Sequence, residues 1–295
     1  MKSSSIIVAI CIMFFATTGN CDIAFVASIG GNWDLFTVND DGSNLVRLTE
    51  TQYDEKTPSW SFDGKKIVYA TSDGNLNLID VQTKETHQIA VSEKKYPKIT
   101  PSFSPDNKEI AFARFRAPEE GDDTDLLIYN LETKQTERVL DQYAIQMWPA
   151  WSPDGSRLVY ANIHCSSACG RIIQELWIVD PRGNFSRQLL MTNSLCQEPA
   201  WSSDGKQVVF SSDKSGNYDI WVLSLDDRKL KQITTYSGLD ISPSWSTDGK
   251  KLAFVSTRSG IMEIWIKDMG SGKLRRLRPF GEKGVECKDV AWNRK

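Results

Sequence analysis

Short apolar segments alternate with short polar turns along most of this chain. Residues 66–70, Lys-Ile-Val-Tyr-Ala, form one such segment, and the turn Asp63-Gly64 precedes it. Short runs rich in β-branched and aromatic residues, bounded by turn residues, predict β-strands. Asp-Gly between two such runs predicts a tight hairpin, because Gly tolerates positive φ and Asp can bond nearby backbone N–H groups. The pattern therefore predicts an all-β protein built from short antiparallel strands.

One motif of this kind recurs five times. The copies are PSWSFDGKKIVYA, PSFSPDNKEIAFA, PAWSPDGSRLVYA, PAWSSDGKQVVFS and PSWSTDGKKLAFV, beginning at Pro58, Pro101, Pro149, Pro199 and Pro243. Their starts lie 43, 48, 50 and 44 residues apart. A self-similarity with a period of about 40–50 residues is typical of propeller blades. In each copy we expect the aromatic of P-[SA]-[WF]-S to turn into the core.

A second motif follows and occurs six times. It reads DLFTV, NLNLI, DLLIY, ELWIV, DIWVL and EIWIK, beginning at Asp34, Asn75, Asp125, Glu175, Asp219 and Glu263. A turn and a more polar strand come after it. Each repeat thus predicts four antiparallel strands, the composition of one propeller blade.

The two ends of the chain complete the count of blades. Val290-Ala291-Trp292-Asn293 stands in for a sixth P-S-W-S, and residues 23–28, IAFVAS, match the strand that should follow it. We therefore predict a six-bladed β-propeller of four-stranded antiparallel blades, closed by N-terminal strands that pair with the C-terminal strand. Such closure removes the open sheet edges that invite pairing with other chains.

The repeat P-[SA]-W-S-x-D-G-[KS] resembles that of the TolB-type β-propeller family over nearly the whole chain after its leader. The resemblance implies the propeller fold and leaves the function open, because similar repeats occur in TolB, in oligogalacturonate lyases and in propellers of prolyl-oligopeptidase-type peptidases. TolB has an extra domain before its propeller. Here we expect none, since the six repeats occupy residues 21–295.

The first twenty residues differ from the rest. Met1-Lys2 is followed by the apolar run at residues 6–16 and then by small or polar residues. This layout predicts a signal peptide over residues 1–20. We therefore expect an exported protein, periplasmic or secreted. A lipid on Cys21 is an alternative and would be its only link to a membrane.

Charge and residue inventory limit the chemistry. The net charge of -3 offers no basic surplus for nucleic acid. A serine hydrolase needs a G-x-S-x-G elbow and an activating His, but the chain has no such elbow and only two histidines, His87 in an expected outer strand and His164 in an expected loop. We predict no catalytic residues, no metal site and no cofactor.

The cysteines suggest a covalent link. Cys165 and Cys169 fall in an expected loop of the third blade, and Cys196 falls in the connection to the next blade, on the same face. Export permits disulfides. We predict a disulfide between Cys196 and either Cys165 or Cys169, with a thiol or zinc pair at Cys165 and Cys169 as the alternative.

The connections between blades line the channel mouth and are the expected binding face, since loops on a rigid scaffold commonly carry function. The candidate contact residues are Tyr53, Tyr96, Tyr143, Trp148, Gln197, Glu198, Asp240 and Lys288. Alternatively, Trp148 and the tyrosines only plug the channel. We predict a non-catalytic propeller that binds a protein or peptide partner in the envelope. The alternative is a polysaccharide lyase or other carbohydrate-active enzyme that uses a metal or channel carboxylates such as Glu198 and Asp240.

Overall fold

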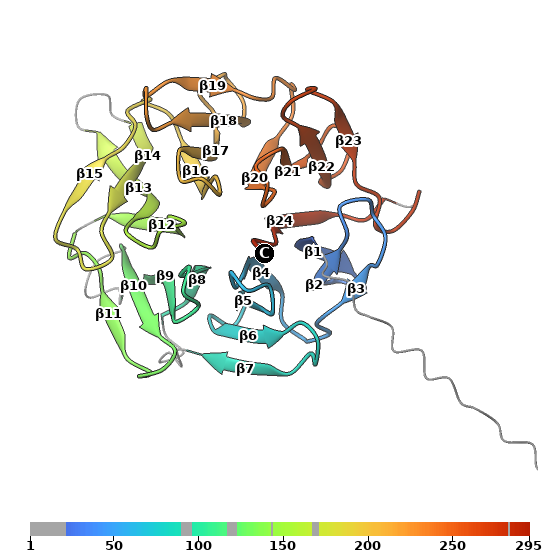
Figure 1. The fold of residues 1–295 in the computed structure, drawn as a ribbon, viewed down its shortest axis with the longest axis horizontal. Helices are drawn as coiled ribbons and strands as arrows, with labels where there is room; N and C mark the ends of the chain where they lie inside the picture. The colour runs from blue at the N-terminus through green and yellow to red at the C-terminus, as the bar shows by residue number, and fades with distance from the viewer. Residues whose placement is uncertain (1–21, 90–95, 117–122, 143, 167–170, 283) are drawn as a thin grey trace, which may run out of the picture.

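The computed structural model describes residues 22–89, 96–116, 123–142, 144–166, 171–282 and 284–295. In these residues all regular structure is β-strand, organised as six four-stranded antiparallel sheets. The sheets stand around a central axis as the blades of a propeller (Figure 1). The predicted fold class is confirmed. The predicted leader, residues 1–20, and Cys21 lie outside the described residues.

Each blade contributes one strand to each of four concentric positions. The inner strands are β4 (Glu55–Trp60), β8 (Lys98–Phe103), β12 (Ile145–Trp151), β16 (Cys196–Trp201), β20 (Asp240–Trp245) and β24 (Cys287–Trp292). The second strands are β5 (Lys66–Thr71), β9 (Glu109–Phe115), β13 (Leu158–Ser166), β17 (Gln207–Ser212), β21 (Lys251–Ser256) and β1 (Ile23–Ile29).

The third strands are β6 (Leu76–Asp80), β10 (Thr124–Asn130), β14 (Arg171–Val179), β18 (Asp219–Ser224), β22 (Glu263–Asp268) and β2 (Asn32–Val38). The outer strands are β7 (Thr86–Ile89), β11 (Thr136–Arg138), β15 (Ser186–Gln188), β19 (Leu230–Gln232), β23 (Leu274–Arg276) and β3 (Val46–Arg47). We number the blades 1 to 6 from the one with inner strand β4 to the one with inner strand β24.

Blade 6 joins the two ends of the chain. Its strand order is β24-β1-β2-β3. Ile23 pairs with Trp292 and Ala27 pairs with Cys287 in an antiparallel ladder. The predicted closure is therefore confirmed. Because β24 supplies the inner strand, blade 6 has four strands like the other five blades.

The hydrophobic core consists of apolar layers between neighbouring blades. Val68 and Leu76 of blade 1, for example, pack in one cluster with Phe112 of blade 2. The repeat aromatics lie in these layers as predicted, and Trp60 and Trp151 are each 2% exposed. A buried aromatic ring removes about 150–250 Å² from water, which at about 25 cal/mol per Å² stabilises the fold by roughly 5 kcal/mol.

In five blades, a buried carboxylate links the third strand to the outer strand. It is the first residue of the second sequence motif, lies within the third strand and contacts a side chain thirteen residues later, on the outer strand. The pairs are Asp34–Arg47, Asp125–Arg138, Glu175–Gln188, Asp219–Gln232 and Glu263–Arg276. Blade 1 has Asn75 at this place. The acidic start of the second motif thus ties the third strand to the outer strand.

The Ser-x-Asp-Gly segments form the hairpins between the inner and second strands. In blade 4, Ser202 donates to Asp204 at 2.6 Å, and the Lys206 N–H donates to the same carboxylate at 3.0 Å. The Ser202 hydrogen bond is the main reason that the pKa of Asp204 lies below its usual value. These local bonds explain why the motif is repeated with so little change.

The two faces of the propeller differ in the connections that they carry. We call the upper face the one with the connections between blades and the hairpins from second to third strands. The lower face carries the hairpins from inner to second and from third to outer strands. In the residues that the structure describes, no helix is long and apolar enough to cross a membrane.

Candidate functional site

A ring of six residues surrounds a central cavity of about 130 Å³, and each blade contributes one of them. Each member precedes a repeat proline, or Val290 in blade 6. This upper ring consists of Thr57, Thr100, Trp148, Glu198, Ser242 and Asp289. The ring lies where the inner strands of all six blades approach the axis, so its side chains determine the chemistry of the channel.

The backbone has the same unusual shape at all six positions. Their φ values lie between 47° and 55°. Each position also coincides with a one-residue bulge. In blade 1, Lys56 pairs with Ala70 and Ser59 pairs with Val68, so the inner strand has one extra residue there. The other five blades repeat this shift. Bulges of this kind redirect a side chain and are frequent beside functional sites.

Apart from Asp289, the residue types in the upper ring are not those that favour this backbone. A left-handed conformation costs a residue with a Cβ about 1–2 kcal/mol, and Gly, Asn or Asp adopts it most readily. The ring contains neither Gly nor Asn. The repeat therefore imposes the backbone, while the side chains vary from hydroxyl to carboxylate to indole. The chemical character of the channel wall at this level therefore differs from blade to blade.

Side chains of alternate ring members hold the backbone of the next blade. The N–H of Thr57 donates to Asp289 at 3.0 Å, and the N–H of Trp148 donates to Thr100 at 3.2 Å. Glu198 accepts from the N–H of Ser242 at 2.6 Å and from its hydroxyl at 2.8 Å. Polar side chains thus connect neighbouring blades across the channel wall.

Two carboxylates give the upper part of the channel an acidic character. Burial raises the pKa of Glu198, and the nearby Asp289 raises it further. Burial also raises the pKa of Asp289, although the N–H of Thr57 and Lys288 oppose this. A donor group or cation that entered the upper mouth would meet both carboxylates.

The lower end of the channel has a different character. The residue between Ser and Asp of each repeat hairpin forms a second ring, which we call the lower ring. Its members are Phe62, Pro105, Pro153, Ser203, Thr247 and, in blade 6, Arg294. All except Pro105 line a cavity of about 200 Å³. The channel is therefore acidic towards its upper mouth, and its lower cavity carries one cation from this ring.

The predicted contact residues occupy several environments. Trp148 and Glu198 belong to the upper ring. Gln197 is half-buried next to Glu198, and Tyr53 is exposed in the connection between β3 and β4. The Lys288 ammonium lies 4.0 Å from the centre of the Trp33 ring. Tyr96 is half-buried at the start of a described segment, and Tyr143 lies outside the described residues.

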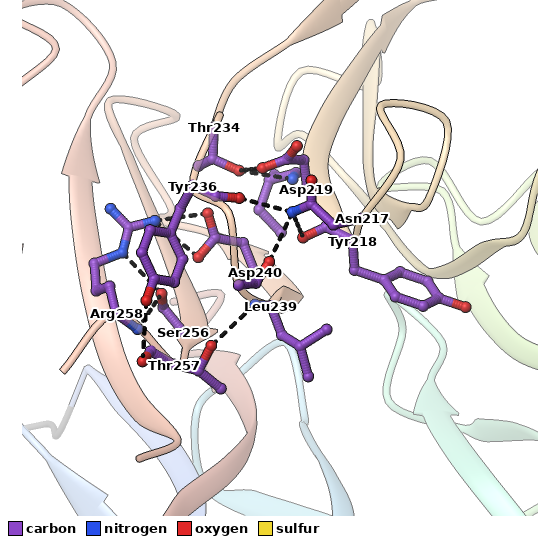
Figure 2. A network of polar contacts seen from close by, with 12 residues as sticks. Asn217, Tyr218, Asp219, Thr234, Tyr236, Leu239, Asp240, Ser256, Thr257 and Arg258 are labelled. Carbon is purple, nitrogen blue, oxygen red and sulfur yellow. Dashed lines mark hydrogen bonds and ion pairs between the residues drawn. The ribbon is translucent and has the colours of Figure 1, made fainter. Parts of the chain in front are cut away.

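Asp240 lies in the protein wall and not on the channel. It is 0% exposed, and Arg258 donates to both of its carboxylate oxygens at 2.8 and 2.6 Å. Figure 2 shows this pair within a network that joins blades 4 and 5. Asp240 was expected as a channel carboxylate like Glu198, but the acid that lines the central cavity with Glu198 is Asp289.

The same network fixes the connection from β19 to β20. Asn217 donates to the carbonyl oxygens of Tyr236 and Gly238, both at 2.7 Å. The Leu239 N–H donates to Thr257 at 2.9 Å. The side chain of Leu239 is nevertheless 40% exposed. Figure 2 shows the Tyr218 ring pointing away from these polar groups. The network therefore presents an apolar side chain on a well-fixed loop.

Cys196 is a buried free thiol in this structure. It contacts the hydroxyls of Thr192 at 3.3 Å and Ser212 at 3.6 Å, and burial raises its pKa. Cys169 lies outside the described residues. Cys165 belongs to β13 and pairs with Ile172, so the expected loop begins later than predicted. The disulfide between Cys196 and either of them stays a prediction.

The two histidines belong to different blades, and neither lies on an inner strand. His87 is exposed on the outer strand β7. His164 belongs to the strand β13, where it pairs with Ile173, and not to a loop as predicted. Longer ladder pairing between β13 and β14 accounts for this difference. Within the described part of the chain, no group of three or more His, Cys, Asp or Glu side chains is placed to hold a metal ion.

Sequence reasoning missed four members of the upper ring and the cation of the lower ring. The missed residues are Thr57, Thr100, Ser242, Asp289 and Arg294. Their signal was present, because each occupies the same repeat position as a neighbour in the next blade. The positive φ that directs the upper-ring side chains into the channel could not be foreseen from these residue types.

Exposed apolar side chains gather on the upper face. Of the six large hydrophobic side chains that are exposed in the described residues, five lie at its connections or strand ends: Tyr53, Phe115, Ile172, Met191 and Leu239. The sixth, Phe185, lies in a lower-face hairpin of blade 3. Met191 is 71% exposed and Ile172 is 60% exposed. The upper face therefore carries most of the exposed large apolar side chains in the described residues.

A comparison with known families agrees with the fold. The family described as the TolB beta propeller domain matches residues 15–166 and 174–290. This chain belongs to that family, as the repeat predicted.

Solved structures of the same fold include proteins with different roles. TolB from Acinetobacter baumannii matches with a TM-score of 0.78 and 22% identity, over 92% of this chain and 66% of that one. Putative TolB from Agrobacterium tumefaciens has a TM-score of 0.69 and 17% identity, over 93% and 99%. Oligogalacturonate lyase from Vibrio parahaemolyticus has a TM-score of 0.61 and 16% identity, over 88% and 75%. Identities this low show a shared fold alone.

Proposed function

We propose that this chain is a non-catalytic binding propeller that holds a protein or peptide partner on its upper face. The observation that carries the proposal is the concentration of exposed apolar side chains on that face. A few anchor side chains that become buried supply most of the binding energy in protein interfaces. Membership of the TolB beta propeller domain family is consistent with this role.

The upper-face loops are suited to binding because they are already ordered. The connection that carries Leu239 is held by hydrogen bonds from Asn217 and to Thr257. Its next residue, Asp240, is fixed by Arg258. A partner would therefore gain contact area without the entropic cost of ordering this loop.

The channel mouth adds polar selectivity at the centre of the same face. A partner segment that reached the axis would meet the Trp148 side chain beside the Glu198 and Asp289 carboxylates. Such a segment would satisfy these acceptors best with N–H or ammonium donors. We therefore infer a partner that combines an apolar rim contact with a donor-rich segment at the centre.

We also propose that the protein acts outside the cytoplasm. The leader-like residues 1–20 support export to the periplasm or the cell surface, and Cys21 would carry a lipid in the alternative. The intact mass of the mature protein tests this proposal. Removal of the first twenty residues is expected, whereas a protein that retains them would contradict it.

Site-specific photocrosslinking tests the binding face. The full chain would carry p-benzoylphenylalanine at Leu239, at Met191 or, as a control, at Phe185, and would be irradiated in cells of its source. Leu239 and Phe185 are 40% and 43% exposed, so the two positions are similarly accessible but lie on opposite faces. We expect the same partner adduct from Leu239 and Met191.

The control position decides the outcome. Adducts from Leu239 and Met191 without the same adduct from Phe185 would support the upper face. Equal adducts at all three positions, or adducts at Phe185 alone, would contradict the proposal. Combined Trp148→Ala and Glu198→Ala changes should reduce the Leu239 adduct if the partner also reaches the channel mouth.

A further inference from the structure

Arg294 stands where the two cavities of the channel meet. It lines both the central cavity of about 130 Å³ and the lower cavity of about 200 Å³. Ala200 and Ser244 are the other residues that line both. The C-terminus lies at the centre of the ring, as Figure 1 shows. Arg294 therefore belongs to the channel and not to the outer surface.

The guanidinium of Arg294 has no carboxylate partner. Among the described residues, no Asp or Glu oxygen lies within ion-pair distance of it, and its one ring contact is with Phe62, whose centre lies 4.6 Å away. Arg294 is half-buried, and this burial without a compensating charge lowers the pKa of its guanidinium to about 10. The charged form is thus less well solvated here than it would be in water.

Other arginines that are largely buried in this protein are paired. Arg116 is 5% exposed and contacts Asp125 at 2.9 Å, and Arg258 is 15% exposed and contacts Asp240 at 2.6 Å. Arg276 is 21% exposed and contacts Glu263. The fold therefore supplies a carboxylate wherever a buried guanidinium serves the structure. Arg294 departs from this pattern.

The hairpin position does not require an arginine. The equivalent residues of the other five blades are Phe, Pro, Pro, Ser and Thr. The backbone on both sides of Arg294 is nevertheless held in place, because the Thr247 hydroxyl donates to the Asn293 carbonyl at 2.7 Å and to the Lys295 oxygen at 3.3 Å. The guanidinium is thus carried by a segment that is fixed against blade 5.

The walls of the lower cavity combine rings with hydroxyl groups. Phe62, Trp201 and Trp245 contribute aromatic surface, while Ser203 and Thr247 contribute hydroxyls. A cavity of this size holds several waters or a small organic molecule. The guanidinium fork matches a carboxylate with two parallel N–H···O bonds. The aromatic walls favour a ligand that also has a carbon body.

We propose that the lower cavity is a binding site for a small organic carboxylate, held by Arg294 and packed between Phe62 and the tryptophans. The ligand would enter from the lower face, opposite the face that we assign to the protein partner. The site does not depend on the proposed function, and either one can fail without the other.

Calorimetric titration of the full mature protein tests this site with three probes. Benzoate offers a carboxylate with a ring, acetate offers the carboxylate with one methyl group, and inorganic phosphate offers the charge alone. We expect benzoate to bind best. Arg294→Gln should weaken benzoate at least about tenfold, and Arg294→Lys should weaken it less, because it keeps the charge without the fork.

The control is Arg182→Gln, which changes an arginine that is 60% exposed in a third-to-outer-strand hairpin of the same face. It should bind benzoate like the wild type. Absence of benzoate binding, or equal binding by Arg294→Gln, would overturn the site. Phosphate binding tighter than benzoate would overturn the carboxylate assignment.

The melting temperature without ligand separates a binding role from a structural one. If Arg294 is retained for a ligand, Arg294→Gln should melt no lower than the wild type, because it removes a desolvated charge. A clearly lower melting temperature would show that Arg294 stabilises the fold, and would overturn the argument that its guanidinium serves to bind an anion.

Discussion

The residue before each repeat proline has a conformation that its side chain does not favour. Thr57 has a φ of 47°, and its hydroxyl is buried without a hydrogen-bond partner among the described residues. Thr100 shares the conformation, but its hydroxyl accepts a hydrogen bond from Trp148. Thr57 thus combines a strained backbone with an unsatisfied polar atom. The Thr57 side chain therefore contributes little to the stability of the fold.

Thr57→Gly should therefore stabilise the protein. The change removes the left-handed strain of about 1–2 kcal/mol and a buried hydroxyl without a partner, against about 0.5–1 kcal/mol for the flexibility of Gly in the unfolded chain. We expect a gain of about 1 kcal/mol in the free energy of unfolding, measured by guanidinium denaturation. Ser59→Gly, two residues further on, should destabilise, because Ser59 accepts from the Phe103 N–H at 3.4 Å. A loss of stability in Thr57→Gly would refute the strain argument.

Glu55 is a buried acid whose ionisation should make stability depend on pH. It is 0% exposed, and burial raises its pKa to about 7, with a smaller contribution from Asp34. Thr51 donates to one of its oxygens at 2.8 Å and partly opposes the rise. The protonated form is therefore favoured in the folded state.

The sign of the effect follows from this raised pKa. The stabilisation is complete below the ordinary Glu value of 4.5 and is lost as the pH rises to about 7. Relative to Glu55→Gln, which does not titrate, the wild type should lose on the order of 3 kcal/mol between pH 4.5 and 7.5. Denaturation of both proteins at these two pH values measures the difference. A difference that stays constant would show that Glu55 titrates normally.

At the scale of the strand and blade, several buried acids link strands to one another, a role that the sequence pattern does not predict. The acid that begins the second sequence motif ties the third strand to the outer strand in five blades. Asp240 does the corresponding work at an inner strand, where Arg258 also lies over the rings of Tyr236 and Trp265 at 5.1 and 5.2 Å. An acid near the channel mouth is thus not automatically a contact residue.

Asp240→Asn should test this structural role. Removing one partner of a buried ion pair leaves the other charge uncompensated and costs about 3–5 kcal/mol. We expect a loss of at least about 3 kcal/mol in the free energy of unfolding, measured by denaturation. Asp240→Asn with Arg258→Met should recover part of it. Asp227→Asn, at an exposed pair with Lys229, should leave the melting temperature unchanged. If Asp240→Asn left the free energy of unfolding unchanged, the structural role would be refuted and Asp240 would again be a candidate contact residue.

At the scale of the whole molecule, the closed ring creates a channel whose two ends differ in charge. Closure by β24 and β1 brings Asp289 into the upper ring and Arg294 into the lower ring. Both residues come from the least regular copy of the repeat. The five complete copies form most of the channel wall. The sixth copy supplies Asp289, one of the two channel acids, and Arg294, the cation of the lower ring. We infer that divergence in the closing blade sets the chemistry of the channel.

The repeats alone were sufficient to predict the strands, the four-stranded blades, the number of blades and the closure by the chain ends. The physical reason is that each blade is specified locally, by a hairpin with its own hydrogen bonds and by alternating apolar strands. The same local information placed Trp148 and Glu198 at the channel mouth. It also located the aromatic of each inner strand in the core.

The arrangement of charges depended on contacts between residues far apart in the chain. Glu198 shares the channel with Asp289 rather than with Asp240, and Arg294 is unpaired while Arg258 is paired. These differences follow from the bulge that turns one residue of each inner strand towards the axis, and from ring closure that brings together residues about 90 or more positions apart. A side chain's neighbours across the channel are set by the geometry of six blades, which no single repeat contains.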